Sequence, residues 1–388
     1  MKLLHTADWQ LGKPFAGIED PDKRSIVRQE RLQCIQRIGE AASRFGAEFI
    51  VVAGDLFDSP TPERGLISSA CEAIGRLGLP VYAIPGNHDH GGPGSLWVQE
   101  FFLQEAGELA PNLHILTTRE PVDLQSCILL PCPLLRQMQK EDPTAWLRSV
   151  LPGLPDNKPR IVLAHGSVTD FGASGFADEE EVTGANNRID IERLPWTEID
   201  YAALGDWHGM KEVGSKAWYA GTPEPDRFPK GGNSPGHVLQ VDVARGREPV
   251  VVPTRTARLG WHWVSENFTD EEGLDRLVAK MNDLLAGRAG VDLVDMELNG
   301  GLGIVRMSEL ESHIERWRAR LLRLKLENRV RVVPAPDEVA ALTQRASDPL
   351  IARVAARLIG EIEQEGEKAD AARAALRILY TRASTGQS

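Results

Sequence analysis

The stretch EFIVVAGDLFD, residues 48–58, decides the fold of this chain. It joins an uninterrupted apolar run to a glycine and then to two carboxylates, the pattern of a buried strand that ends in a polar turn. The same pattern recurs at KLLHTADWQ (2–10), PVYAIPGNHD (80–89), RIVLAHG (160–166) and YAALGDWH (201–208). Amphipathic stretches lie between these runs, the first at residues 25–45. This order predicts an α/β fold in which a sheet is covered by helices.

The composition indicates a folded chain of more than one domain. The 388 residues are 42% hydrophobic, and 44 basic against 56 acidic side chains give a net charge of −12. This length is typical of two or three domains, and the apolar content excludes wholesale disorder. No uncharged apolar run reaches the ~18–20 residues that span a bilayer, so we expect no membrane segment. Charge at Asp8 comes before any signal-peptide apolar stretch forms.

The cysteines and the charge narrow the class of protein further. Four cysteines without CxxC spacing argue against a disulfide scaffold or a structural zinc site, and they indicate a reducing cytoplasm. The negative net charge argues against a protein that coats nucleic acid through its overall charge. It leaves room for a local basic groove, or for a metal site that itself supplies positive charge.

The pattern of expected strands and helices divides the chain into three regions. Strands and helices alternate over residues 1–258, and the Gly- and Pro-rich stretch 221–236 is a loop near the end of this region. Residues 259–335 predict a smaller α+β module in the order β-α-β-α-β, whose second helix is expected over 308–328. Residues 336–388 predict a helical tail.

Polar side chains lie at or just beyond the ends of five apolar strands. Ligands of open α/β sheets bind at the carboxyl ends of strands, so we expect these groups to converge. Asp, Asn, His and Gln side chains without thiolates suit Mn²⁺, Mg²⁺, Fe²⁺ or Zn²⁺. Each motif alone is better explained as a helix cap, a turn or a packed histidine, whereas their joint order favours a metal site. The candidate residues are Asp8, Gln10, Asp55, Asp58, Asn87, His88, His165, Asp206 and His208.

Over residues 1–258 the chain resembles calcineurin-like metallophosphoesterases, and within them the DNA-repair exonucleases typified by the SbcD subunit of the SbcC–SbcD complex. The resemblance rests on the five strand-end motifs, on HTADWQLGK (5–13) and on IDYAALGDWH (199–208) and WYAGTPEP (218–225). It implies two packed sheets flanked by helices, followed by an α+β capping domain and a helical tail. The later region matches this family only in its order of elements.

The resemblance also implies a role for each candidate residue. Asp8 and His208 would bind a first metal, Asn87 and His165 a second, and Asp55 would bridge both. His88 would lie beside the scissile phosphate as general acid or as a stabiliser of the transition state, with Asp58 or Asp89 to orient it.

Two positions depart from the family pattern. Gln10 stands where the family has a histidine that binds the first metal, and Asp206 replaces the first histidine of the last motif. Both side chains offer oxygen, so an oxygen-rich site with three aspartates should prefer Mn²⁺, or Mg²⁺, over softer ions. The alternative is that these substitutions disable one metal site and leave a one-metal or inactive protein.

The function that the resemblance implies is metal-dependent cleavage of DNA, as a 3′-to-5′ exonuclease on duplex ends and an endonuclease on single strands. The expected partners are DNA, an SbcC-like coiled-coil ABC ATPase and a second copy of the chain in a homodimer. The chain carries no GxxxxGK[ST] motif, so ATP dependence would come from another protein. The rival functions are hydrolysis of small nucleotides or phosphoproteins, and DNA-end binding without turnover.

Several further residues can be interpreted either as functional or as ordinary surface or packing residues. Arg227 and Lys230, like Lys13, could meet phosphates or be surface charges. Trp9 and Trp207 could stack on bases, although packing over the metal cluster is favoured. The arginine-rich segment 316–325 could follow a DNA backbone or be a solvated face, and the tail helices could dock on the ATPase or on the chain's own capping domain.

Overall fold

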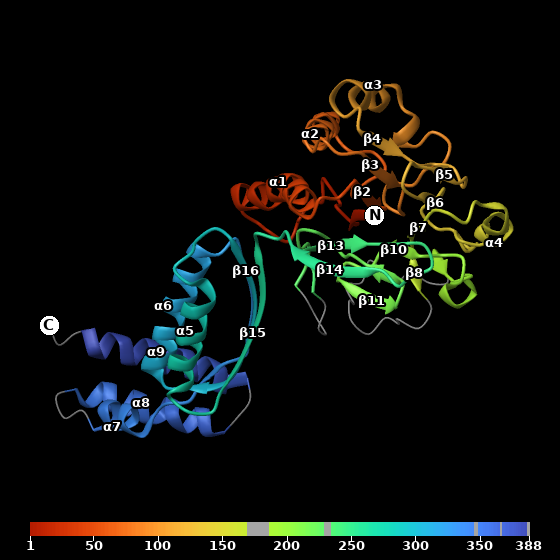
Figure 1. Ribbon diagram of the computed structural model, residues 1–388. Helices are drawn as coiled ribbons and strands as arrows, with labels where there is room; N and C mark the ends of the chain where they lie inside the picture. Colours follow the sequence, from red (N-terminus) through yellow and green to blue (C-terminus); the bar gives the residue numbers. More distant parts are fainter. Residues whose placement is uncertain (169–185, 229–233, 345–347, 365–366, 386–388) are drawn as a thin grey trace. The chain divides into compact units, whose positions relative to one another are not determined.

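The computed structural model describes residues 1–168, 186–228, 234–344, 348–364 and 367–385. It divides into two compact units, Met1–Trp261 and His262–Ser388 (Figure 1). The division predicted at residues 258 and 335 stays a prediction. In the described residues, no helix is both long enough and apolar enough to cross a membrane.

Two six-stranded sheets form the framework of the first unit. The first sheet has the order β14-β13-β1-β2-β3-β4 and the second β11-β12-β10-β7-β6-β5 (Figure 1). The strands of the first sheet are β1 (Lys2–Thr6), β2 (Phe49–Ala53), β3 (Val81–Ile84), β4 (Leu113–Ile115), β13 (His237–Asp242) and β14 (Val250–Arg255). Those of the second are β5 (Val122–Asp123), β6 (Ile128–Cys132), β7 (Arg160–His165), β10 (Tyr201–Gly205), β11 (Lys211–Gly214) and β12 (Ala217–Tyr219). The short strands β8 (Ser167–Val168) and β9 (Arg188–Ile189) pair with each other.

Alternating side chains of the central strands build the layers of this unit. Leu4 of β1 packs with Ile35 in a core between the first sheet and its helices. Its neighbour Leu3 points the other way and shares a core with Leu163 of the second sheet. The helices are α1 (Pro21–Phe45), α2 (Arg64–Gly75), α3 (Glu100–Leu109) and the short α4 (Leu147–Val150). Two facing sheets with helices outside confirm the predicted α/β metallophosphoesterase architecture.

The first helix begins earlier than its apolar spacing predicts. Asp20 accepts hydrogen bonds from the backbone N–H groups of Asp22 and Lys23 at 2.9 and 3.2 Å, and Pro21 occupies the first helical position. The helix ends at Gly46, whose φ of 72° lies in the left-handed region. Capping, and not hydrophobic periodicity, therefore sets both ends of α1.

The second unit contains a small sheet and a set of helices. Its sheet has the order β15-β16-β17, with β18 paired to β16. The elements are β15 (Gly260–Phe268), α5 (Gly273–Leu285), β16 (Asp292–Leu302), α6 (Ile304–Arg320), β17 (Arg323–Asn328), β18 (Arg331–Val332), α7 (Pro336–Thr343), α8 (Pro349–Glu363) and α9 (Glu367–Thr385). Apolar residues of α5, β16 and α6 share one core, which explains the alternation of strand and helix in this region.

One predicted element of this unit is wrong at its C-terminal end. The helix expected over 308–328 ends at Arg320, and β17 pairs in parallel with β16 from Arg323 onward. Arg323 and Lys325 therefore lie on a strand, so the arginine-rich helix expected over 316–325 does not exist as such. The sequence RLKLEN alternates apolar and polar residues, which is the period of a strand.

Candidate metal centre

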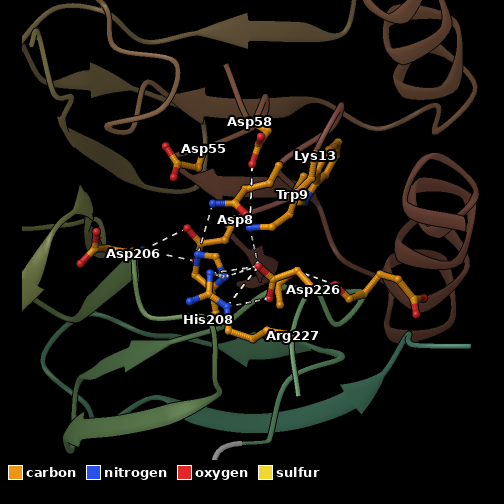
Figure 2. A network of polar contacts seen from close by, with 12 residues as sticks. Asp8, Trp9, Lys13, Asp55, Asp58, Asp206, His208, Asp226 and Arg227 are labelled. Atoms are coloured by element: carbon orange, nitrogen blue, oxygen red, sulfur yellow. Dashed lines mark hydrogen bonds and ion pairs between the residues drawn. The ribbon is translucent and has the colours of Figure 1, made fainter. Parts of the chain in front are cut away.

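The ends of five strands deliver the candidate residues to one place. Asp8 follows β1, Asp55 follows β2, Asn87 follows β3, His165 ends β7 and Asp206 follows β10. The strands β1, β2 and β3 are parallel, and so are β7 and β10, so their carboxyl ends lie on the same side of each sheet. Figure 2 shows Asp8, Asp55 and Asp206 in the same region.

His165 forms the centre of a group of oxygen donors. Ligand atoms of Asp8, Asp55 and His165 all lie within 4.8 Å of one another. Nε2 of His165 lies 2.8 Å from Asn87 Oδ1, 3.6 Å from Asp55 Oδ2 and 3.8 Å from Asp206 Oδ1. Its Nδ1 lies 2.9 Å from the Ala53 carbonyl oxygen, which can only accept, so Nδ1 carries the hydrogen. The lone pair of the neutral ring is therefore on Nε2, among the carboxylates.

The clustered carboxylates around His165 favour a bound cation. Burial, and then the carboxylates of Asp55 and Asp206, raise the pKa of Asp8 well above its usual range. Burial and the nearby Asp55 raise the pKa of Asp89 to about 7. Burial lowers the pKa of His165, which keeps the ring neutral as a metal ligand must be. A divalent ion among these groups would stabilise the charged carboxylates.

Gln10 and His208 lie in a neighbouring hydrogen-bond network that includes the positively charged side chain of Lys13. Gln10 Oε1 accepts a hydrogen bond from Lys13 Nζ at 2.8 Å, and Gln10 Nε2 lies 3.3 Å from His208 Nε2. His208 Nδ1 lies 2.9 Å from Asp226 Oδ2, which also accepts from Lys13 at 2.8 Å. Figure 2 shows Lys13, His208 and Arg227 converging on Asp226. Burial alone would raise the pKa of Asp226, but His208, Arg227 and Lys13 hold it well below its usual range.

The backbone of the site is held in strained conformations. Asp8, Gln10, Asp55 and Asp206 have φ of 52°, 41°, 53° and 102°, four of the seven non-glycine residues with positive φ in the described parts of the chain. Such conformations cost about 1–3 kcal/mol each and persist where the surroundings impose them. Gly86 allows the loop after β3 to approach closely, since a Cβ there would lie 2.1 Å from Asp55 Oδ1.

His88 lies at the edge of this group and makes a direct contact with it through its backbone. Its N–H donates to Asp55 Oδ1 at 3.0 Å, and its Nδ1 lies 3.0 Å from the Asp58 carbonyl oxygen. The backbone carbonyl of Asp58 thus orients the ring. The Asp89 carboxylate is buried and accepts from the N–H groups of Phe57 and Gly86, so it holds the two loops together.

Comparison with known proteins identifies a matching family. The chain matches the family described as calcineurin-like phosphoesterase over residues 1–210. It belongs to this family. Among solved structures, the crystal structure of TT1561 of Thermus thermophilus is similar at 13% sequence identity, with a TM-score of 0.41, over 66% of this chain and 98% of that chain. This likeness is too distant to bear on function.

Membership of the calcineurin-like phosphoesterases implies a metal-dependent phosphoester hydrolase that uses two divalent ions. The residues around His165 fit one ion, because three carboxylates and an amide surround a neutral imidazole. Gln10 and His208 also offer ligand atoms, with Asp226 placed to orient His208 as carboxylates orient metal-bound histidines. These two residues are, however, already hydrogen bonded within the protein.

The residues of this phosphoesterase that were predicted to contact phosphates or bases lie in different surroundings. Arg227 is bound to Asp226, with Nη2 to Oδ2 at 3.1 Å, and lies beside His208. Lys230 falls outside the described residues. Trp9 is 2% exposed and donates to Thr6 Oγ1, so it packs and does not stack on bases. Trp207 is half-buried against the second sheet's outer core, with Lys211 Nζ 4.9 Å from its ring centre.

Sequence reasoning missed two residues that support the site. Asp226 lies eighteen positions after His208 in the loop 221–228, and only its role as partner of a histidine could have suggested it. Arg31 of α1 is 3% exposed and donates to the carbonyl oxygens of Asp8, Trp9 and Glu224 at 3.2, 2.6 and 2.8 Å. Nothing in the local sequence distinguishes Arg31 from the other polar residues of its helix.

Proposed function

We propose that this phosphoesterase is a metal-dependent DNA phosphodiesterase, a 3′-to-5′ exonuclease on duplex ends and an endonuclease on single strands. The observation that carries the proposal is the position of WYAGTPEP (218–225), one of the stretches that resemble the DNA-repair exonucleases. It leads from β12 into the loop in which Asp226 supports His208. The resemblance therefore extends to residues around the site, beyond the ligands that the whole family shares.

The ions, when bound, would supply Lewis-acid chemistry at the phosphodiester. Asp55, Asn87, His165 and Asp206 would hold one ion, and Asp8, Gln10, Asp55 and His208 the other. The oxygen-rich donor set favours Mn²⁺, with Mg²⁺ as the alternative.

His88 would handle the proton of the reaction. The Asp58 carbonyl oxygen fixes the hydrogen of its Nδ1, so Nε2 is the ring atom that would act on the substrate. When water attacks the phosphorus, the bond between phosphorus and the sugar oxygen breaks and that oxygen needs a proton. His88 in its protonated form would donate the proton from Nε2, or would hydrogen bond to a non-bridging oxygen as charge develops there.

The assembly follows the same resemblance. The partner would be an SbcC-like coiled-coil ABC ATPase, which would dock on the tail helices, and the phosphoesterase would act as a homodimer in the cytoplasm. In support of a docking surface, Leu350 and Val354 lie one turn apart on α8 and are 72% and 40% exposed. The four cysteines are free and buried, as a reducing compartment allows.

The test compares DNA with small substrates in parallel. Duplexes labelled at the 3′ or the 5′ end and a single-stranded circle are incubated with the full chain and Mn²⁺, Mg²⁺ or Zn²⁺. Bis(p-nitrophenyl) phosphate, cyclic nucleotides and a phosphoprotein are the comparison substrates. We expect loss of nucleotides from 3′ ends and opening of the circle, strongest with Mn²⁺. Turnover of the small substrates with intact DNA would reject the nuclease in favour of a small-molecule or phosphoprotein phosphatase.

The engagement of Gln10 by Lys13 favours a second candidate, a DNA-end-binding subunit with weakened turnover. This candidate predicts end binding by the natural chain and cleavage only after the double substitution Gln10→His and Asp206→His. Cleavage by the natural chain at a rate comparable to the double variant would exclude it.

A further inference from the structure

The side chain of Lys13 contacts Gln10, one of the residues expected to bind a metal. Lys13, in the loop after β1, is 21% exposed at its side chain. Its ammonium is 2.8 Å from Gln10 Oε1, 2.8 Å from Asp226 Oδ2 and 3.9 Å from Asp58 Oδ1 (Figure 2). A cation of the protein thus contacts the oxygen that Gln10 would offer to a metal.

The identity of the neighbours fixes the direction of the hydrogen bonds. An ammonium only donates, so the Gln10 atom that faces Lys13 is the oxygen, and the amide nitrogen faces His208. The carboxylate of Asp226 accepts the hydrogen of His208 Nδ1, which leaves the lone pair on Nε2. Gln10 Nε2 lies 3.3 Å from that lone pair and can donate to it. Gln10 and His208, two of the ligands expected for this ion, are therefore already hydrogen bonded to protein groups.

The group around His165 differs in charge from the network around Gln10 and His208. Asp8, Asp55 and Asp206 bring three carboxylates to a neutral ring, with Asp206 Oδ1 3.8 Å from its Nε2. An ion there would lie among three carboxylates, whereas an ion at Gln10 and His208 would lie beside the ammonium of Lys13. Coulomb repulsion from Lys13 therefore lowers the affinity of the second position, and its ion pair with Asp226 offsets part of that repulsion.

We propose that Lys13 is an internal competitor of the second divalent ion. The chain holds one ion tightly in the group around His165, and it takes another at Gln10 and His208 only after the ammonium of Lys13 moves away. Occupancy of the second position, and with it any activity that needs two ions, then follows the free concentration of the metal. This inference concerns ion binding alone and does not depend on the nuclease proposal.

The test is a titration of the full chain with Mn²⁺ in the absence of any substrate. Calorimetry gives the affinities, and electron paramagnetic resonance distinguishes a single ion from an exchange-coupled pair. For the natural chain we expect one tight ion and a second that binds at least about tenfold more weakly. In Lys13→Met the second ion should bind about tenfold more tightly, and the coupled spectrum should appear at two equivalents.

Lys280→Met is the matched control, because it removes an exposed lysine on α5 of the other unit. It should behave as the natural chain does. Lys13→Gln serves as a second variant that keeps a polar head, and retention of the tight ion shows that each variant is folded. Two ions of similar affinity in the natural chain would overturn the proposal. So would a second-ion affinity in the two Lys13 variants equal to that of Lys280→Met.

Discussion

Asp55 and His88 share one hydrogen bond but should respond differently to removal. Asp55→Ala takes away a ligand atom from the group around His165, so we expect loss of bound metal and of all measurable turnover. His88→Ala removes a ring that contacts Asp58 and leaves the group of ligands intact. It should keep its metal and lose turnover by about 10²–10⁴-fold. Metal content after gel filtration, measured beside turnover, separates the two, and loss of metal from His88→Ala would show that this ring is a ligand.

His5 should make the stability of the first unit sensitive to acid. The ring is buried, with Nδ1 2.9 Å from the Tyr201 hydroxyl. Burial, partly offset by the Leu204 carbonyl, lowers its pKa from 6.5 to about 3. Between these values the unfolded chain binds a proton that the folded chain does not, so stability is present at neutral pH and is lost as pH falls below 6.5. For one such group the loss between pH 7 and pH 5 is about 2 kcal/mol.

Urea unfolding in EDTA at the two pH values measures this effect for the natural chain and for His5→Gln. The glutamine can still hydrogen bond but does not titrate. Because other buried groups such as Asp89 titrate in both proteins, the difference between the two losses isolates His5. We expect the natural chain to lose about 2 kcal/mol more than the variant, and equal losses would show that His5 is not the group responsible.

At the scale of elements, α1 supports the site through a single buried side chain. Arg31 connects the backbone after β1, at Asp8 and Trp9, to the loop that carries Asp226, at Glu224. Arg31→Met would remove this donor from the buried carbonyl oxygens of Asp8 and Trp9, each at a cost of about 1–3 kcal/mol. The Glu224 carbonyl oxygen would keep the hydrogen bond from the Thr222 hydroxyl. We expect a loss of about 3–5 kcal/mol in the free energy of unfolding and weaker Mn²⁺ binding, because the strained loops are released.

Arg28→Met is the control for this helix, since Arg28 is exposed on α1. It should change the free energy of unfolding by no more than about 0.5 kcal/mol. Arg31→Lys should recover part of the stability but not the Mn²⁺ affinity, since an ammonium cannot span the two loops as the planar guanidinium does. Mn²⁺ affinity in Arg31→Met equal to that of Arg28→Met would reduce Arg31 to a structural role.

The elements also show what sequence can and cannot predict. Strand-end residues such as Asp55 were found because the chain direction itself places them at the sheet edge. The end of α6 was missed because Leu321 and Leu324 continue the helical spacing while Arg323–Asn328 already alternate as a strand. Asp226 escaped notice because its role arises from a loop that folds back onto His208, and no local period records such a contact.

At the scale of the whole molecule, the metal-centre residues lie in one unit. Every described candidate ligand, and both supporting residues Asp226 and Arg31, falls within Met1–Trp261. The second unit has its own core, with Leu277, Met296 and Leu310 completely buried. Each unit therefore has its own hydrophobic core, the usual condition for a domain that folds by itself. Truncation can then test whether ion binding depends on the second unit.

A fragment of residues 1–261 should melt cooperatively, bind Mn²⁺ as the full chain does and hydrolyse bis(p-nitrophenyl) phosphate at a similar rate, because all described ligands are present. If the second unit serves as a platform for DNA, the fragment should lose at least about tenfold in cleavage of duplex ends, the equivalent of about 1.4 kcal/mol of binding. Full-length Asp55→Ala marks the background of both assays. Equal loss on the small diester and on DNA would mean that the second unit stabilises the metal centre itself. Unchanged cleavage of DNA would mean that residues 262–388 serve another purpose, such as docking of a partner.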